Sequence, residues 1–260
     1  MQPADTADRT ELFERLYATD LVYQPDCWKL CGDAHCCSFK RYKSRFRIVG
    51  RSDSQDLPLL PGEFDFLEAR GWTGQFQDFI RHAQPYDFGP GTAVLDTVSS
   101  RRPGCRCDHD TRTVICRLYP LLPVFDVDGH LVGTEAMGVF EELEHLEGLA
   151  PACQISALPF AQMGLFLRIC ELLASDPVVL FHLEAYRRTK RHVFDRLAQA
   201  KATTGKSAFA LYEGAFLRQR LFDHDALKAD LAGLHGSFEA RYGRRYTAGM
   251  MQMRAPREVA

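Results

Sequence analysis

The sequence predicts an α+β protein in which a cysteine-rich, loop-rich metal-binding part with short strands precedes a helical C-terminal part. Eight of the nine cysteines lie in the first 155 residues. Short strand-like stretches bounded by glycine and proline lie in the same part of the chain. From Pro159 onward, apolar residues instead recur at helical spacing.

The N-terminal elements are predicted from their apolar spacing. Residues 8–18 favour a helix with Leu12 and Leu16 on one face, and Asp8 with Glu11 resembles a capping box. Residues 45–49 alternate like a short strand. The following segments are expected to form a connector at 57–62, short helices at 63–69 and 74–82, and a loop at 89–91.

Strands are expected next at 93–98 and 114–119, followed by a hairpin at 124–133 with Asp128-Gly129 as its turn. An apolar stripe then predicts a helix over 163–174. Ser175-Asp176-Pro177 is a typical helix start, and two more helices are expected at 207–221 and 225–242. The predicted organisation is a cysteine-cluster metal-binding domain at 1–155, a helical domain at 156–243, and a mobile tail without periodicity at 244–260.

Composition and charge favour a soluble globular protein. Hydrophobic residues make up 46% of the chain, charged residues 25%, and the net charge is −2. Such values indicate neither a nucleic-acid partner nor a membrane partner, so an unknown protein or small molecule is expected. Residues 1–10 show no secretory signal, and the longest apolar stretch, 157–170, contains Pro159 and Arg168. A cytoplasmic location is therefore expected.

Clustered cysteines in a reducing compartment are more often metal ligands or redox groups than disulfides. The predicted metal ligands are Cys27, Cys31, Cys36 and Cys37 in a first group, Cys105, Cys107 and Cys116 in a second, and Cys153 after the hairpin. Both groups are expected to meet at one centre or at two adjacent ones, with most sulfurs of Cys31, Cys37, Cys107 and Cys116 within about 8 Å of one another.

Two local features bear on the kind of metal site. If the backbone is locally extended, the side chains of the adjacent residues Cys36 and Cys37 point to opposite sides, which suits a single tetrahedral ion poorly. A multi-iron cluster, two nearby metals, or one ligand beside one packing residue would all relieve this geometry. Arg106 and Arg117 adjoin cysteines, and a nearby guanidinium group favours the metal-binding thiolate.

These motifs resemble those of the bacterial YkgJ-like, or CxxCxxCC, cysteine-cluster family, whose members are described as zinc- or iron-chelating. The matching residues are the group ending in Cys36-Cys37, the run Cys107-x8-Cys116-Arg117-Leu118-Tyr119-Pro120, Arg112 between those cysteines, and Cys153 after the hairpin. The first group, C-x3-C-x4-CC, is wider than in that family, and Thr113 replaces its usual proline. The resemblance covers residues 25–155 and implies an iron–sulfur cluster or iron, with zinc as the alternative.

Weaker patterns have simpler interpretations. Residues 200–207, ending in Gly205-Lys206-Ser207, match a relaxed phosphate loop, but an amphipathic helix precedes them, so a helix–helix turn is expected. A single Glu142-x-x-His145 lacks the second copy that a di-iron bundle needs. Cys170 lies on an apolar stripe and is expected in the core. His35 and His109 remain possible additional ligands.

Three functional hypotheses follow. The first is a metal-binding protein that holds an iron–sulfur cluster or a zinc or iron centre through the clustered cysteines. The second is an iron-dependent oxidoreductase acting on a substrate or peptide bound by the helical part. The third is an accessory protein with a structural metal and a partner-binding helical face, which a large exposed apolar patch on the helices would favour.

Overall fold

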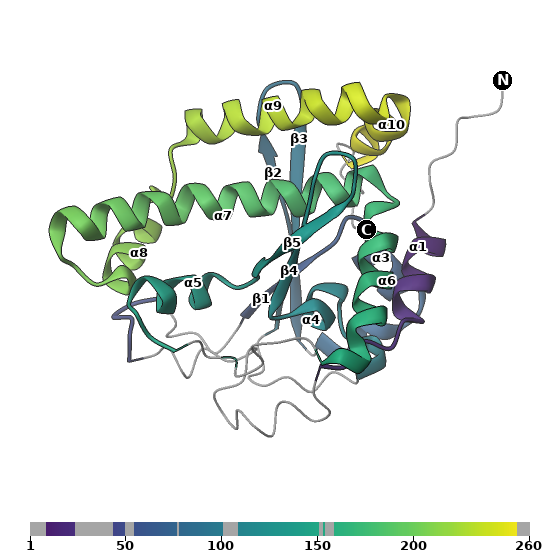
Figure 1. The fold of residues 1–260 in the computed structure, drawn as a ribbon, viewed down its shortest axis with the longest axis horizontal. Coiled ribbons are helices and arrows are strands. Elements are labelled where there is room, and N and C mark those ends of the chain that lie inside the picture. The colour runs from purple at the N-terminus through teal and green to yellow at the C-terminus, as the bar shows by residue number, and fades with distance from the viewer. Residues whose placement is uncertain are drawn as a thin grey trace.

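The computed structural model of the chain describes residues 9–23, 44–49, 55–76, 78–100, 109–150, 153 and 159–253. Within these residues the fold is mixed α+β (Figure 1). The first described elements are α1 (Thr10–Tyr17), β1 (Gln55–Leu59), α3 (Glu63–Ala69), the 3₁₀ helix η3 (Trp72–Phe76), β2 (Phe79–Asp87), β3 (Thr92–Ser100), η4 (His109–Thr111) and α4 (Val114–Leu118).

The hairpin strands β4 (Leu121–Phe125) and β5 (Leu131–Ala136) follow. After them the described elements are helical: α5 (Val139–Leu146), η5 (Phe160–Gln162), α6 (Met163–Ala174), α7 (Pro177–Thr204), α8 (Ala208–Leu217), α9 (His224–Tyr242) and α10 (Arg244–Met253). The described strands therefore all precede the described helices α5 to α10.

Three strands form an antiparallel sheet in the order β1-β3-β2, and β4 pairs with β5 in a second sheet. β3 is the central strand, where Val98 lies opposite Leu57 on one side and Arg81 on the other. Val98 is fully buried. Val98 belongs to the larger cluster of buried side chains, so β3 contributes directly to the core.

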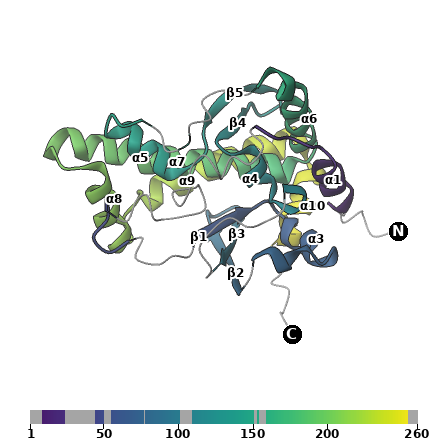
Figure 2. The same cartoon turned by 90° about the horizontal axis from the view of Figure 1, so that it is seen from below.

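The long helix α7 crosses the molecule, and α9 packs along it (Figure 1). Viewed from below, α6, α1 and α3 gather near one end of α7, whereas α8 and α5 lie toward the other (Figure 2). α10 packs against α7, α9 and β3. α7 therefore connects two regions of the fold.

These two regions have separate clusters of buried side chains. The larger cluster combines Phe13, Phe64 and Val98 from the first half of the chain with Phe181 and Leu234 from the second. The smaller one lies where α5, α7, α8 and residues 44–49 meet, and its members are Phe46, Leu143, Val193, Phe194, Leu197, Ala208 and Phe209. Helices of the second half thus share a core with strands of the first, while the proposed domain division at residue 155 stays a prediction.

Most of the periodic segments are confirmed. α1, α3, β3, the turn after β2, the β4–β5 hairpin, and α6 to α9 all occur where the sequence predicts them. At the start of α7, Asp176 accepts hydrogen bonds from the amides of Val178 and Val179. In the hairpin turn Gly129 has φ +86°, a conformation that glycine adopts without strain.

The prediction of a strand at residues 45–49 was wrong. These residues form turns, because the amides of Arg47, Ile48 and Val49 all donate to the carboxylate of Glu213 on α8. A side chain that is distant in sequence takes these three donors, so they are not available to a strand ladder. The alternating pattern alone could not reveal that partner.

Two neighbouring predictions also require correction. The expected connector at 57–62 begins inside β1, where Pro58 is tolerated because β1 is an edge strand. The helix expected at 74–82 is replaced by the end of η3 and the start of β2. Pairing with β3 along the whole of β2 overrides the local helical preference.

Two corrections concern helices that the sequence did not predict. The strand expected at 114–119 is helix α4, which begins because the Thr113 hydroxyl accepts from the Cys116 amide. The tail expected to lack periodicity from residue 244 forms α10 through Met253. Tyr246 and Met250, four residues apart, are buried there, so tertiary packing stabilises a helix with a weak sequence signal.

Candidate metal centre

Cys116, one of the predicted ligands, lies on the short helix α4 and is partly buried. Its amide donates to Thr113 Oγ1 at 3.3 Å, which caps the helix. Tyr119 follows the last helical residue, Leu118, and the Tyr119–Pro120 peptide bond is cis. The motif Cys116-Arg117-Leu118-Tyr119-Pro120 thus spans the end of α4 and leads into β4.

Arg117 connects the chain before the first cysteine group to the chain between Cys107 and Cys116. Its Nη1 donates to the carbonyl oxygens of Tyr17 at 3.2 Å and Thr19 at 3.0 Å. Its Nη2 donates to Asp110 O at 2.7 Å, and Nε donates to Arg112 O at 3.2 Å. Only 4% of Arg117 is exposed, and burial lowers its pKa. A buried guanidinium group therefore joins the chain before the first cysteine group to the chain after Cys107.

Two more hydrogen bonds extend this junction. The Tyr23 hydroxyl donates to the Leu118 carbonyl at 3.0 Å, and Val22 N donates to Gln162 Oε1 at 2.9 Å. Tyr23 is the last described residue before the first cysteine group, and Gln162 follows Cys153 by nine residues. The last described residues before the first cysteine group therefore contact the end of α4 and the 3₁₀ helix η5, which follows Cys153 in the chain.

A buried carboxylate stabilises the same junction. Glu63 Oε1 accepts from the Tyr17 hydroxyl at 2.8 Å and from Val114 N at 2.7 Å, while Oε2 accepts from Leu60 N at 2.9 Å. Burial raises the pKa of Glu63. The three bonds connect α1, the start of α3 and the first residue of α4. Glu63 was not predicted from the sequence, because no local motif distinguishes it from other helical glutamates.

Among the predicted ligands, only Cys116 and Cys153 belong to the described residues, and both are partly buried. Cys27, Cys31, Cys36, Cys37, Cys105 and Cys107 lie outside them, as do His35 and Arg106. The predicted proximity of Cys31, Cys37, Cys107 and Cys116 therefore stays a prediction. What the structure adds is the arrangement of the chain on either side of these stretches.

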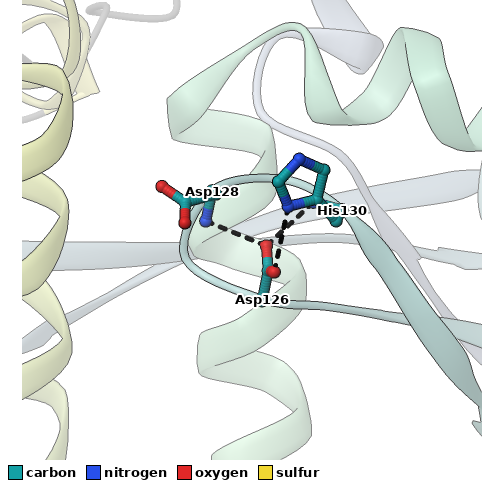
Figure 3. Close-up of side chains that lie close together, drawn as sticks. All are labelled: Asp126, Asp128 and His130. Carbon is teal, nitrogen blue, oxygen red and sulfur yellow. Dashed lines mark hydrogen bonds and ion pairs between the residues drawn. The ribbon is translucent and has the colours of Figure 1, made fainter.

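Within the described residues, one other group has side chains close enough to hold a metal ion: Asp126, Asp128 and His130, whose potential ligand atoms lie within 4.8 Å of one another. Figure 3 shows Asp126 facing His130, while the Asp128 carboxylate points away from them. Asp126 Oδ1 accepts from the amides of Asp128 at 2.9 Å and His130 at 2.8 Å. Asp128 Oδ1 pairs with Arg241 Nε at 2.5 Å.

These contacts account for the group without a metal. It closes the β4–β5 turn and attaches that turn to α9, where the Tyr242 hydroxyl also donates to Val127 O at 2.9 Å. Hydrogen bonding, first from the His130 amide, lowers the pKa of Asp126. The Asp-x-Asp-Gly-His pattern could have suggested the group from sequence, but it is a pattern typical of tight turns.

The weaker sequence patterns are also explained. α7 ends at Thr204, Gly205 has φ +64°, and α8 starts at Ala208, so the apparent phosphate loop is the expected helix–helix turn. Glu142 accepts from Lys190 Nζ at 2.8 Å, which places it in an ion pair between α5 and α7. Cys170 is 2% exposed, and burial raises its pKa to about 12, which confirms it as a core residue.

No family model, curated protein or solved structure matches the chain. No helix among the described residues is long and apolar enough to cross a membrane.

Proposed function

We propose that the chain is a metal-binding protein that holds an iron–sulfur cluster, or an iron or zinc centre, beside helix α4. The proposed ligands are Cys27, Cys31, Cys36, Cys37, Cys105, Cys107, Cys116 and Cys153. The resemblance to the YkgJ-like family belongs to this proposal, since it rests on the same cysteines.

The observation that carries the proposal is the set of contacts around Arg117. The chain before Cys27, reached through Tyr17 and Thr19, and the chain after Cys107, reached through Asp110, meet at this one side chain. Cys116 is its neighbour in sequence. A metal site assembled from distant segments needs such fixed points, because each ligand must come from a chain already close to the centre.

The chemistry around Cys116 is also compatible with thiolate ligation. A guanidinium charge next to a cysteine favours the thiolate over the thiol. The described hydrogen bonds of Arg117 go to carbonyl oxygens, and the carboxylates of Asp110 and Glu63 also interact electrostatically with its charge. That charge would offset part of the negative charge that several thiolates bring to one site. Thiolates suit both iron and zinc, so the ligand set does not choose between them.

The direct experiment is anaerobic purification followed by metal and sulfide analysis and an absorption spectrum. Iron with sulfide and broad absorption near ~400 nm would identify a cluster, whereas zinc in a colourless protein would identify the alternative. Protein purified with less than about one equivalent of any metal, and unable to bind added iron or zinc, would overturn the proposal.

Two cysteines offer a matched pair of variants. Cys116→Ala should lose most of the metal, since it removes a proposed ligand from α4. Cys170→Ala removes a thiol of the same size from the core and should retain the metal. Equal metal content in both variants would exclude Cys116 as a ligand.

A further inference from the structure

Helix α8 has a polarity pattern opposite to that of an ordinary surface helix. Its sequence, AFALYEGAFL, contains one charged residue, Glu213, and that residue is buried. The outward positions Ala210, Phe216 and Leu217 are exposed and apolar. A solvent-facing helix normally turns its charged residues outward and its apolar residues toward the core. The exposed side of α8 therefore lacks the polar surface that water would favour.

The inward position of Glu213 has a clear structural cause. Its carboxylate accepts three backbone hydrogen bonds, from Ile48 N at 2.6 Å, Val49 N at 2.8 Å and Arg47 N at 3.1 Å. These bonds hold residues 44–49 against α8. As a result Ile48, which is 55% exposed, is held against the same helix that carries Phe216 and Leu217, each 48% exposed. We refer to Ile48, Phe216 and Leu217 as the α8 patch.

Aromatic contacts anchor the α8 patch to the smaller core. Phe216 stacks on Tyr212, with ring centroids 6.2 Å apart and an angle of 13° between the planes. Tyr212 in turn contacts Phe46 at 6.2 Å, and Phe46 meets Phe209 edge-on at 5.4 Å. The exposed Phe216 is thus the outer member of an ordered aromatic row. It already has a defined position, so binding there would cost little ordering entropy.

Exposed basic side chains accompany the α8 patch. Arg45, Arg47, Lys206, Arg218 and Arg220 are all exposed in the described segments 44–49 and 206–222, whose single acidic residue is the buried Glu213. Arg218 folds back along α8, where its Nε donates to Gly214 O at 2.9 Å. Arg45 lies over the Phe209 ring, 5.6 Å from its centroid. The described segments that carry the α8 patch therefore combine exposed apolar residues with exposed cations, and Asp223, the next acidic residue along the chain, caps α9.

We propose that the α8 patch docks an acidic amphipathic segment of a partner protein, whose apolar side covers Phe216 and Leu217 and whose carboxylates meet the arginines. Charge complementarity selects an acidic occupant. The composition favours protein over lipid, because protein interfaces are enriched in aromatic residues and arginine and depleted in lysine. Four of the five cations here are arginines, which bind carboxylates in a bidentate fashion.

Two other occupants fit the surface less well. A second copy of the chain, paired through the same patch, would bring like charges together across a symmetric interface. A helix that lies in a membrane surface carries lysine and arginine along its polar face, whereas the one charged residue of α8, Glu213, is acidic and buried. The inference stands apart from the metal proposal and does not depend on it.

The test is a selection from a displayed library of random peptides about 16 residues long, enough for roughly four helical turns. The bait is the full chain, with counter-selection against the double variant Phe216→Ser/Leu217→Ser. We expect enrichment of peptides with net negative charge and apolar residues at positions i, i+3 or i+4, and i+7. No selective enrichment, or enrichment of basic peptides, would overturn the proposal.

A selected peptide is then titrated by fluorescence anisotropy. Phe216→Ser/Leu217→Ser and, separately, Arg218→Glu/Arg220→Glu should each weaken binding by about ten-fold or more. Val132→Ser, which changes a 63% exposed apolar residue on β5, should change affinity less than about two-fold. Equal weakening by all three variants would place the binding site elsewhere, against the proposal.

Sedimentation with phosphatidylserine vesicles and measurement of the oligomeric state complete the test. Vesicle binding, or self-association, that disappears in Phe216→Ser/Leu217→Ser would assign the patch to lipid or to a second copy and overturn the proposal. Melting curves of all variants check folding. The charge-reversal pair changes only exposed side chains, so it keeps the test valid if the serine variant unfolds.

Discussion

Arg117 illustrates how one side chain can organise a site that the sequence places in distant segments. It donates to carbonyl oxygens from the chain before the first cysteine group and from the chain between Cys107 and Cys116. A buried carbonyl oxygen that loses its hydrogen-bond donor lowers the free energy of unfolding. Lysine cannot replace the planar set of N–H donors that a guanidinium group provides. The contribution of Arg117 should therefore exceed that of a surface arginine.

The first prediction follows. Arg117→Lys should lower the free energy of unfolding by at least about 2 kcal/mol, because several buried carbonyls lose their donors. Urea denaturation measures this. Arg241→Lys, at a half-exposed ion pair with Asp128, is the matched control and should cost less than about 1 kcal/mol. The folded Arg117→Lys protein should also retain less metal. Equal stability and metal content in both variants would contradict a central role for Arg117.

Glu213 gives a prediction that depends on pH. Burial raises its pKa, but hydrogen bonds from the amides of Ile48, Val49 and Arg47 outweigh this and lower the pKa below the ordinary 4.5. A lowered pKa stabilises the fold fully above 4.5, and the contribution disappears as the pH falls through the lowered value. Glu213→Gln should therefore cost about 1–3 kcal/mol at neutral pH and progressively less in acid.

Denaturation of wild type and Glu213→Gln across this pH range measures the difference. Glu68→Gln, at an exposed position on α3, is the control and should change the free energy of unfolding at neutral pH by less than about 0.5 kcal/mol. A difference between wild type and Glu213→Gln that stays constant with pH would show that the charge of Glu213 does not stabilise residues 44–49.

At the scale of elements, the sequence predicted those whose residues carry their own signal. α7 combines a capping Asp176, a following proline and a sustained apolar stripe, and the β4–β5 hairpin has its Asp-Gly turn. α4, β2 and the turns at 44–49 depend on distant partners such as Glu63, β3 and Glu213. The candidate site divides in the same way, since its cysteines were visible in the sequence whereas Arg117's partners and Glu63 were not.

The α7–α8 turn allows the phosphate-loop alternative to be tested. Lys206→Ala should leave stability unchanged, because Lys206 is exposed in a helix–helix turn, and neither wild type nor variant should show saturable ATP binding at this turn. Gly205→Ala should instead cost about 1 kcal/mol, since Gly205 has φ +64°. Thermal melts and ATP titration measure both effects. Saturable ATP binding that Lys206→Ala abolishes would contradict the turn interpretation.

Helix α10 is the element whose role differs most from the sequence expectation. Tyr246 is fully buried. It packs among Phe181, His235 and Phe238, and its hydroxyl lies 2.7 Å from His235 Nδ1. Tyr246→Ala should therefore lower the free energy of unfolding by about 3–5 kcal/mol. Met251→Ala, at a 67% exposed position on the same helix, should cost less than about 1 kcal/mol. Similar losses in denaturant titrations would mean that α10 does not pack as described.

At the scale of the whole molecule, two buried clusters are joined by α7. The larger contains residues of α1, α3 and β3 together with residues of α6, α7 and α9. Such a shared core can persist without a metal, because it buries many apolar side chains from both halves of the chain. α4 differs, since it is five residues long and its fixed points lie next to the cysteine stretches.

The last prediction concerns metal removal. Metal bound only by the folded state contributes its binding free energy to folding, and the effect is local where the remaining core is self-sufficient. Hydrogen exchange on holo and metal-free protein should therefore show protection lost at α4 and at Val22 and Tyr23. α7, α9 and β3 should keep theirs, as should Leu197 and Phe209 in the smaller cluster. Unchanged exchange at α4 after metal removal would show that the metal does not stabilise this helix. Loss of protection throughout would instead mean that the larger core depends on the metal, in conflict with its composition from both halves of the chain.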